Sequence, residues 1–205
     1  MQTRKTCIGY RKPVIHGLRR SGKRLGAGFT LLELLIALAV LSVLTSVAIP
    51  GFETIYAQNH LAASSNQLLT ALVNARQTAM MRNASVTFCA GNPDDGCDGD
   101  WLAHEMIVFV DTDRDGKLDP EDELKLSERF SASTVIEVSG NGPFRKSIVF
   151  RPTGLAQWPG GAFAAGRLRI CTQTALTTNA TDLVLIGSGR VVTEQHDFDG
   201  ACPAP

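Results

Sequence analysis

The densest group of ionisable side chains lies in residues 111–122, which read DTDRDGKLDPED. Alternating acidic residues followed by a glycine are typical of an EF-hand-like loop, whose oxygen ligands bind Ca²⁺ from positions one, three, five, seven, nine and twelve. The residues at those positions are Asp111, Asp113, Asp115, Lys117, Asp119 and Asp122. Lys117 would contribute only its backbone carbonyl, and Gly116 occupies position six, where the loop must turn tightly. The loop is therefore a candidate Ca²⁺ site, and Ca²⁺ is the one cofactor that the sequence suggests.

The same loop also has a purely structural interpretation. It joins two predicted strands, 106–111 and 124–130, in place of the two helices of an EF-hand, and Asp and Gly are common in hairpin turns. Position twelve is Asp rather than the usual Glu. A weak calcium site and a solvated turn are both compatible with this pattern.

Positive charge gathers farther along the chain. Between Gly140 and Arg190 there are six Lys and Arg residues against one acidic residue, Asp182. Arg167 and Arg169 alternate along a predicted strand, so their side chains share a face. The candidate basic face comprises Arg145, Lys146, Arg167, Arg169 and Arg190. Such a face can bind the phosphates of DNA, or it can meet solvent or an acidic neighbouring subunit.

Residues suited to catalysis are not arranged for it in the sequence. His60, His104 and His196 have no Ser or Cys nearby in a nucleophile setting, and the stretch 187–189 (GSG) lacks the G-x-S-x-G spacing. Phosphate-binding and dinucleotide fingerprints are missing as well. The chain is therefore predicted not to be an enzyme.

One charge is placed inside an apolar segment of membrane-spanning length. Residues 29–49 read FTLLELLIALAVLSVLTSVAI, and Glu33 is the sole charge among them. As a helix this segment spans about 30 Å, the thickness of a bilayer's hydrocarbon core. Residues 1–28 carry eight Lys and Arg and no acid, which predicts that the leader stays in the cytoplasm and the remainder is sent outward across the membrane. A carboxylate in such a segment costs a few kcal/mol and usually marks function.

The exported part contains an even number of cysteines. Cys89, Cys97, Cys171 and Cys202 permit three pairings in an oxidising compartment. We favour Cys89–Cys97, which closes the loop CAGNPDDGC, together with Cys171–Cys202, which ties down the C-terminal tail. A metal centre is the weaker interpretation, because no CxxC pair is present.

The elements that position these residues are one long helix and a set of strands. Beyond Pro50, the apolar residues Leu61, Leu68, Leu72 and Ala79 follow helical spacing to about Arg82. Short β-rich runs separated by turn residues follow, at 86–90, 106–111, 124–130, 134–138, 147–151, 167–172, 182–186 and 190–193. We therefore expect an α+β fold in which a long N-terminal helix, hydrophobic and then amphipathic, packs on a C-terminal antiparallel β-sheet domain. The expected divisions are a leader (1–28), a membrane half-helix (29–50), an amphipathic half-helix (51–84) and a β-rich domain (85–205).

The order of basic leader, Gly28, Phe29-Thr30-Leu31-Leu32-Glu33 and a later Pro50 resembles the type IV pilin and pseudopilin family. The resemblance implies cleavage between Gly28 and Phe29 by a prepilin peptidase, followed by N-methylation of Phe29. It also implies that Glu33 pairs with the Phe29 amine of a neighbouring subunit, and that Pro50 kinks the helix. A plain signal anchor with a stray Glu is the alternative, but these residues all fall in the family's register.

Features of the β-rich part are similar to the GspH/FimT branch of that family. They are a Cys-containing first strand, Trp101 before the strand ending at Asp111, the acidic turn, and a closing Gly189-Arg190. This resemblance implies a minor pseudopilin of a type II secretion system or a minor pilin of a type IV pilus tip or priming complex. Its partners would be other subunits, the prepilin peptidase and methyltransferase, and an inner-membrane assembly platform.

Some members of the FimT branch are DNA-uptake receptors with a C-terminal GRxR motif. Here the closing strand reads Gly189-Arg190-Val191-Val192, so the second arginine is missing, and GRxR occurs one strand too early, at 166–169. DNA binding is therefore an alternative that the sequence does not favour.

Overall fold

The structure is a computed structural model that describes residues 29–103, 105–130 and 135–205, with the side chains of 47–50 excluded. The predicted leader and its cleavage residue, Gly28, lie outside the described residues. The chain divides into two compact units at Val43/Leu44, and each is described here by itself.

A single helix, α1, runs from Leu31 to Arg82 and contributes to both units. Through Leu44 its large apolar side chains are more than half exposed, as expected of a segment without a polar face. The helix continues through Pro50 without interruption, and the kink expected there stays a prediction. At its C-terminus Asn83 adopts a left-handed φ of 52°, and the N–H of Ala84 donates to the carbonyl of Ala79 at 3.3 Å, which is a Schellman cap.

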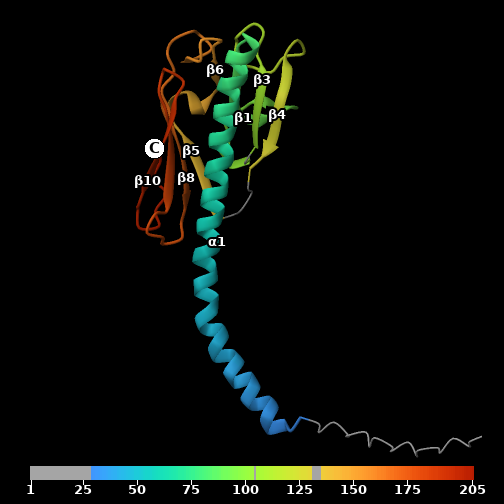
Figure 1. Cartoon of the computed structure of the whole chain (residues 1–205), viewed down its shortest axis with the longest axis vertical. Helices are drawn as coiled ribbons and strands as arrows, with labels where there is room; N and C mark the ends of the chain where they lie inside the picture. Colours follow the sequence, from blue (N-terminus) through green and yellow to red (C-terminus); the bar gives the residue numbers. More distant parts are fainter. Residues whose placement is uncertain (1–28, 104, 131–134) are drawn as a thin grey trace, which may run out of the picture. The chain divides into compact units, whose positions relative to one another are not determined.

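Two antiparallel sheets follow the helix (Figure 1). The first has the order β4-β3-β1-β6-β7, with β2 paired to the end of β1. Its strands are β1 (Val86–Asn92), β2 (Gly96–Cys97), β3 (Glu105–Val110), β4 (Glu123–Arg129), β6 (Ile148–Phe150) and β7 (Ala156–Gln157). The second has the order β10-β9-β8-β5. Its strands are β5 (Ile136–Gly140), β8 (Gly166–Thr172), β9 (Ala180–Leu185) and β10 (Val191–His196), and two short 3-10 helices, η1 (Trp101–Ala103) and η2 (Gly142–Arg145), complete the domain.

One hydrophobic core joins the second half of α1 to both sheets. Leu61, Leu68 and Leu72 on the helix belong to the same buried cluster as Phe88 on β1 and Ile170 on β8. At its centre the Trp101 ring lies 5.9 Å from the Phe88 ring, and its Nε1–H donates to the Phe144 carbonyl at 2.8 Å. The helical stripe predicted from the sequence is therefore the face that packs on the sheets, as Figure 1 shows for the green part of α1.

The predicted α+β class is confirmed, and the eight predicted strands appear within a few residues of their expected bounds. The strands form two sheets around the helix, and the two-residue strands β2 and β7 were not predicted. Such short strands carry no alternation of their own and exist because a neighbouring strand pairs with them.

Candidate functional site

The N-terminal end of α1 positions Glu33 close to Phe29. Thr30 is the residue before the helix, and its Oγ1 accepts the backbone N–H of Glu33 at 3.2 Å, as in a capping box of the form T-x-x-E. Glu33 thus lies in the first turn, where the helix dipole favours a carboxylate, and Phe29 is 80% exposed just before it. The segment from Leu31 is apolar and long enough to cross a membrane, and its most apolar window is unburied. The arrangement places one acid in the first turn of an apolar helix, directly after the exposed Phe29.

Both predicted disulfides are present. Cys89 on β1 bonds to Cys97 on β2, with 5.6 Å between their Cα atoms, and this bond closes the loop between the two strands. Cys171 on β8 bonds to Cys202, 31 residues later in the sequence, with a Cα separation of 5.8 Å. The pairing favoured from the sequence is confirmed.

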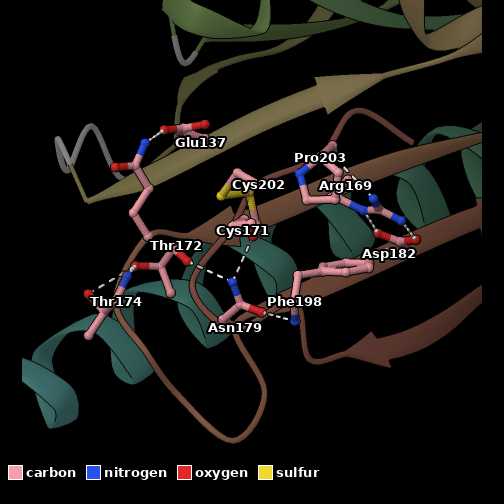
Figure 2. The surroundings of a disulfide bond; sticks show 12 residues. Glu137, Arg169, Cys171, Thr172, Thr174, Asn179, Asp182, Phe198, Cys202 and Pro203 are labelled. Carbon is pink, nitrogen blue, oxygen red and sulfur yellow. Dashed lines mark hydrogen bonds and ion pairs between the residues drawn. A yellow bond between two sulfur atoms is a disulfide. The ribbon is translucent and has the colours of Figure 1, made fainter.

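The second disulfide is one of several attachments of the C-terminal tail, residues 197–205, to the second sheet. Asn179 is fully buried, and its side chain donates to the carbonyls of Thr172 and Ala201 and accepts the N–H of Phe198. Arg169 donates to the carbonyl of Pro203 at 2.9 Å, and its guanidinium lies 4.5 Å from the centre of the Phe198 ring. Figure 2 shows the tail residues Phe198, Cys202 and Pro203 gathered around Arg169 and Asn179. The tail is therefore a structural part of this sheet.

The predicted basic face is largely neutralised within the chain. Asp182 on β9 is opposite Arg169 in the strand register and fully buried. Its Oδ1 accepts from Arg169 Nε at 2.7 Å, and its Oδ2 accepts from a second nitrogen of Arg169 at 2.8 Å and from Arg167 at 2.7 Å. Arg167 and Arg169 share a face, as predicted, but both pair with one buried carboxylate, and Arg169 also donates to Pro203 of the tail.

The remaining contacts of this network also balance charge. Arg167 makes a second ion pair, with Glu194 at 3.0 Å, and His196 at the end of β10 lies 3.3 Å from Asp182. Burial opposes ionisation of Asp182, but the hydrogen bonds from Arg169 and Arg167 outweigh it and hold the pKa of this carboxyl below its usual value. Conversely, the hydrogen bond to Asp182 raises the pKa of Arg167. The two arginines of this network therefore have two carboxylates, Asp182 and Glu194, as partners within the chain.

The other three residues of the predicted basic face remain exposed but lie on separate segments. Arg145 is at the end of η2 with Lys146 directly after it, whereas Arg190 lies in the turn between β9 and β10. Arg145 donates to the carbonyl of Gly140 at 3.3 Å. The five predicted residues are thus not brought together as one surface.

The acidic loop forms the turn between β3 and β4. Asp111 is almost fully buried, and its carboxylate accepts from Thr87 Oγ1 at 2.6 Å and from the N–H groups of Arg114 and Gly116 at 2.6 and 3.1 Å. Burial raises the pKa of Asp111 against the effect of these hydrogen bonds. Carboxylate oxygens of Asp111, Asp113 and Asp115 lie within 4.8 Å of one another. The first three predicted ligand positions therefore converge in a way that could hold a cation.

The other predicted ligand positions, Lys117, Asp119 and Asp122, make different contacts. Asp122 accepts the backbone N–H groups of Thr112 and Asp119, at 2.9 and 3.1 Å, and so connects the two ends of the loop. Lys117 extends its ammonium group to within 3.4 Å of the Asp115 carboxylate. Partial desolvation, with the charges of Asp115 and Glu121, raises the pKa of Asp119. Among the described residues, Asp111, Asp113 and Asp115 form the part of the predicted calcium loop that the structure assembles.

Asp182, Asn179 and Thr87 have roles that the sequence analysis did not assign. For Asp182 the sequence does hold an indication, because it is the one acidic residue between Gly140 and Arg190 and lies within an apolar strand. The roles of Asn179 and Thr87 depend on contacts 19 and 24 residues away, to Phe198 and Asp111, for which the sequence holds no local pattern.

Comparison with known proteins finds two family matches and two similar crystal structures. Residues 64–190 match the family described as type II transport protein GspH, and residues 23–49 match the prokaryotic N-terminal methylation motif. Two crystal structures of the type IV minor pilin FimU from Pseudomonas aeruginosa are similar in fold at 15% identity. One covers 67% of this chain and 90% of its own, with a TM-score of 0.48, and the other covers 65% and 92%, with a TM-score of 0.46. No curated protein matches the sequence.

An N-terminal methylation motif on an apolar helix, followed by antiparallel sheets, defines a subunit of the type IV pilin superfamily. The GspH match covers more than half of the residues, so the chain belongs to the GspH family. The resemblance to pilins and pseudopilins inferred from the sequence is therefore confirmed, and with it a function of the minor pilin or pseudopilin type.

Proposed function

We propose that the protein is a minor pseudopilin or minor pilin that is cut after Gly28, N-methylated on Phe29, and built into a short filament through α1. In this proposal residues 29–49 hold it in the bacterial inner membrane, and residues 85–205 form a periplasmic domain. The observation that carries the proposal is Glu33, the sole charge between Phe29 and Ile49, placed by the Thr30 cap in the first turn of an apolar helix.

The position of Glu33 makes assembly favourable. A charged residue at the centre of a membrane helix costs about 2.5–3.5 kcal/mol on insertion scales, which is an upper bound for Glu33 near the start of the segment. Cleavage leaves a cationic amine on Phe29, and in a bundle of subunits Glu33 of one chain meets this amine of a neighbour. Pairing removes an uncompensated charge from lipid, so leaving the membrane for the filament lowers the free energy of the subunit.

The soluble domain supports a structural rather than an enzymatic role. Its disulfides hold the β1–β2 loop and the C-terminal tail, and its core joins both sheets to α1, which suits a subunit that must bear load or present a surface. We place the subunit at the tip of a pseudopilus that pushes substrates through a secretin, or in a complex that primes pilus assembly. Its partners are then other subunits, the prepilin peptidase and methyltransferase, and the inner-membrane assembly platform. Neighbouring secretion ATPase, secretin and pseudopilin genes would indicate type II secretion, whereas pilus assembly genes would indicate a type IV pilus.

The N-terminus of the native protein tests the processing step. Mass spectrometry should find N-methylated Phe29 as the first residue, and Gly28→Glu should leave the full-length precursor in the membrane. A native protein that begins at Met1 would refute the proposal.

Glu33 tests the assembly step, and Glu53 is its matched control because it is the other acidic residue of α1. Glu33→Ala should leave cleavage after Gly28 intact and abolish incorporation into filaments, measured by shearing and immunoblotting. Glu53→Ala should assemble normally. Normal assembly of the Glu33 variant would contradict the pairing mechanism.

DNA uptake is the alternative that the family raises, and the charge network weighs against it. Arg167 and Arg169 already share Asp182, so binding phosphate there would have to displace a buried ion pair. We expect no shift of duplex DNA by the protein in a gel at low salt. A shift that Arg190→Ala abolishes would reassign the protein as a DNA receptor.

A further inference from the structure

The acidic loop between β3 and β4 (Figure 1) is folded back onto the first sheet. Leu118 packs against Cys89, Ile107 and Phe109, a small cluster separate from the core that contains α1. Gly116 is buried, and a Cβ at this position would lie only 2.5 Å from Pro159 Cγ, so the loop also lies tightly against the segment after β7. The chain therefore holds six acidic side chains, all within residues 111–122, close to its own surface.

Three of these carboxylates face one another. Oxygens of Asp111, Asp113 and Asp115 lie within 4.8 Å of one another. Two oxygens bound to the same Ca²⁺ lie at most about 5.2 Å apart, because each bond is about 2.3–2.6 Å long. Among the described residues their ion-pair partner is Lys117, 3.4 Å from Asp115, but its side chain is 77% exposed. Water screens such a pair, so a divalent cation can replace it.

A buried hydroxyl lies beside the cluster without a partner. Ser85 is 5% exposed, and its Oγ has no hydrogen bond to any described residue. The N–H of Asp111 donates to the Ser85 carbonyl at 2.9 Å, one step beyond the paired Val86 and Val110, so the side chains of Ser85 and Asp111 share a face. Thr87, next on that face, already donates to Asp111. Ser85 and Asp111 also line one cavity of about 210 Å³ at the base of the loop. An orphaned buried hydroxyl at this point indicates a missing ion, water or ligand.

We propose that Asp111, Asp113 and Asp115, with the hydroxyl of Ser85 acting directly or through one water, form a Ca²⁺ site that fastens the acidic loop to the start of β1. The carbonyl of Lys117, at position seven, is the further oxygen that an EF-hand-like loop supplies. A cation here relieves the repulsion among the carboxylates and gives the Ser85 hydroxyl its partner. The site lies wholly within the β-rich domain, so it is independent of the filament role proposed above.

The ligand set selects Ca²⁺ among the common divalent cations. Every ligand is an oxygen, and residues 111–122 contain no His or Cys of the kind that Zn²⁺ prefers. Mg²⁺ requires a regular octahedron with bonds of about 2.0–2.1 Å, whereas Ca²⁺ accepts irregular sets of six to eight oxygens. Asp122 is held by the N–H groups of Thr112 and Asp119, so it supplies no bidentate ligand at position twelve. The expected dissociation constant is therefore in the weak class, about 10⁻⁴–10⁻³ M.

The loop's own lysine reports whether the loop is held down. An endopeptidase specific for lysine can cut after Lys117 only when Leu118 leaves its cluster, and Lys146, exposed outside the loop, is the internal reference. Neither of the two disulfides spans residue 117, so one cut divides the chain on a non-reducing gel. For the full-length chain in detergent, Ca²⁺ at ten times the dissociation constant should slow cleavage after Lys117 about tenfold relative to EGTA. Cleavage after Lys146 should not change.

Three variants assign the effect to the proposed ligands. Asp113→Asn removes one charge from the cluster and should abolish the protection. Ser85→Ala should leave cleavage in EGTA unchanged, because the hydroxyl has no partner to lose among the described residues. In Ca²⁺ it should move the midpoint of protection to a concentration about tenfold higher. Ser127→Ala, on exposed β4, is the matched control and should leave the midpoint where it is.

Three results would overturn the site. Equal cleavage after Lys117 in Ca²⁺ and EGTA would show that no ion holds the loop. Equal protection by Mg²⁺ at the same concentration would show only general screening of like charges. A Ser85→Ala midpoint that coincides with that of the unsubstituted chain would show that the ion does not reach β1. None of these results would affect processing at Gly28 or assembly through Glu33.

Discussion

The acidic loop at 111–122 and the arginine pair on β8 are charged regions of opposite sign with opposite internal arrangements. In the loop, three carboxylates converge within 4.8 Å, and Asp111 is held by a hydroxyl and by backbone N–H groups. On β8, Arg167 and Arg169 converge on a carboxylate from the neighbouring strand, which neutralises them. A dense cluster of like charge therefore indicates a binding site only when the chain does not supply the counter-ion itself. In this domain the arginine pair has its counter-ion in Asp182, whereas the three converging carboxylates of the loop have Lys117, 3.4 Å from Asp115, as their nearest ion-pair partner from the described chain.

The largest effect is expected from removing Asp182, the carboxylate that Arg167 and Arg169 share. Asp182→Ala leaves Arg169 buried and Arg167 partly buried without their main partner, and breaking a buried pair from one side costs about 3–5 kcal/mol. Urea unfolding of the full-length chain in detergent, followed by tryptophan fluorescence, would measure this loss. The control is Glu194→Ala, which removes a partly exposed acid from the same network and should cost less than about 1 kcal/mol. Equal small effects would mean that the arginine pair is a solvated surface after all.

The disulfide under the tail comes next in expected size. Replacing Cys171 and Cys202 by Ser opens a loop of 31 residues, which in the chain-entropy account costs about 3.7 kcal/mol. Replacing Cys89 and Cys97 opens a loop of eight residues and should cost about 2.5 kcal/mol by the same account. The first variant should also expose residues 197–205 to limited proteolysis, because only non-covalent contacts such as those of Asn179 and Arg169 then hold the tail. Retention of protease resistance would show that the hydrogen bonds suffice.

The pH dependence of stability also tests the pairing of Asp182 with the two arginines, with a smaller expected effect. The pKa of Asp182 is lower in the folded chain than in the unfolded chain, so its ionisation stabilises the fold above the unfolded value of about 4. That contribution is lost as the pH falls through the lower, folded pKa. The free energy of unfolding should therefore decline on acidification below about pH 4. Asp182→Asn should decline less steeply there, and parallel curves for the two chains would contradict the assignment.

The sequence was sufficient for features that depend on local pattern, and insufficient for those that depend on strand register. The apolar spacing of Leu61, Leu68 and Leu72 identified the packed face of α1, and cysteine number with loop composition identified both disulfides. The sequence also showed that Arg167 and Arg169 share a face. It did not show that β9 pairs with β8 so that Asp182 lies opposite Arg169, because one residue of slip would turn Asp182 toward the core. The role of the tail was hidden for the same reason, since Asn179 reaches Phe198 and Ala201 only through the fold.

The smallest expected effect tests the other half of the comparison, the acidic loop. If Asp111, Asp113 and Asp115 bind Ca²⁺, a Ca²⁺ concentration ten times the dissociation constant stabilises the folded chain by about 1.4 kcal/mol. The melting temperature of the full-length protein in detergent should then rise between EGTA and millimolar Ca²⁺, and more than with Mg²⁺, which fits such loops poorly. Asp115→Asn should abolish the rise, whereas Asp94→Asn, at an exposed acid of the disulfide loop, should retain it. Melting curves that do not differ between Ca²⁺ and EGTA would make the loop a hairpin turn. In that case its carboxylates, like the arginines of β8, would be satisfied from within the chain, here by the N–H groups of Arg114, Gly116 and Thr112.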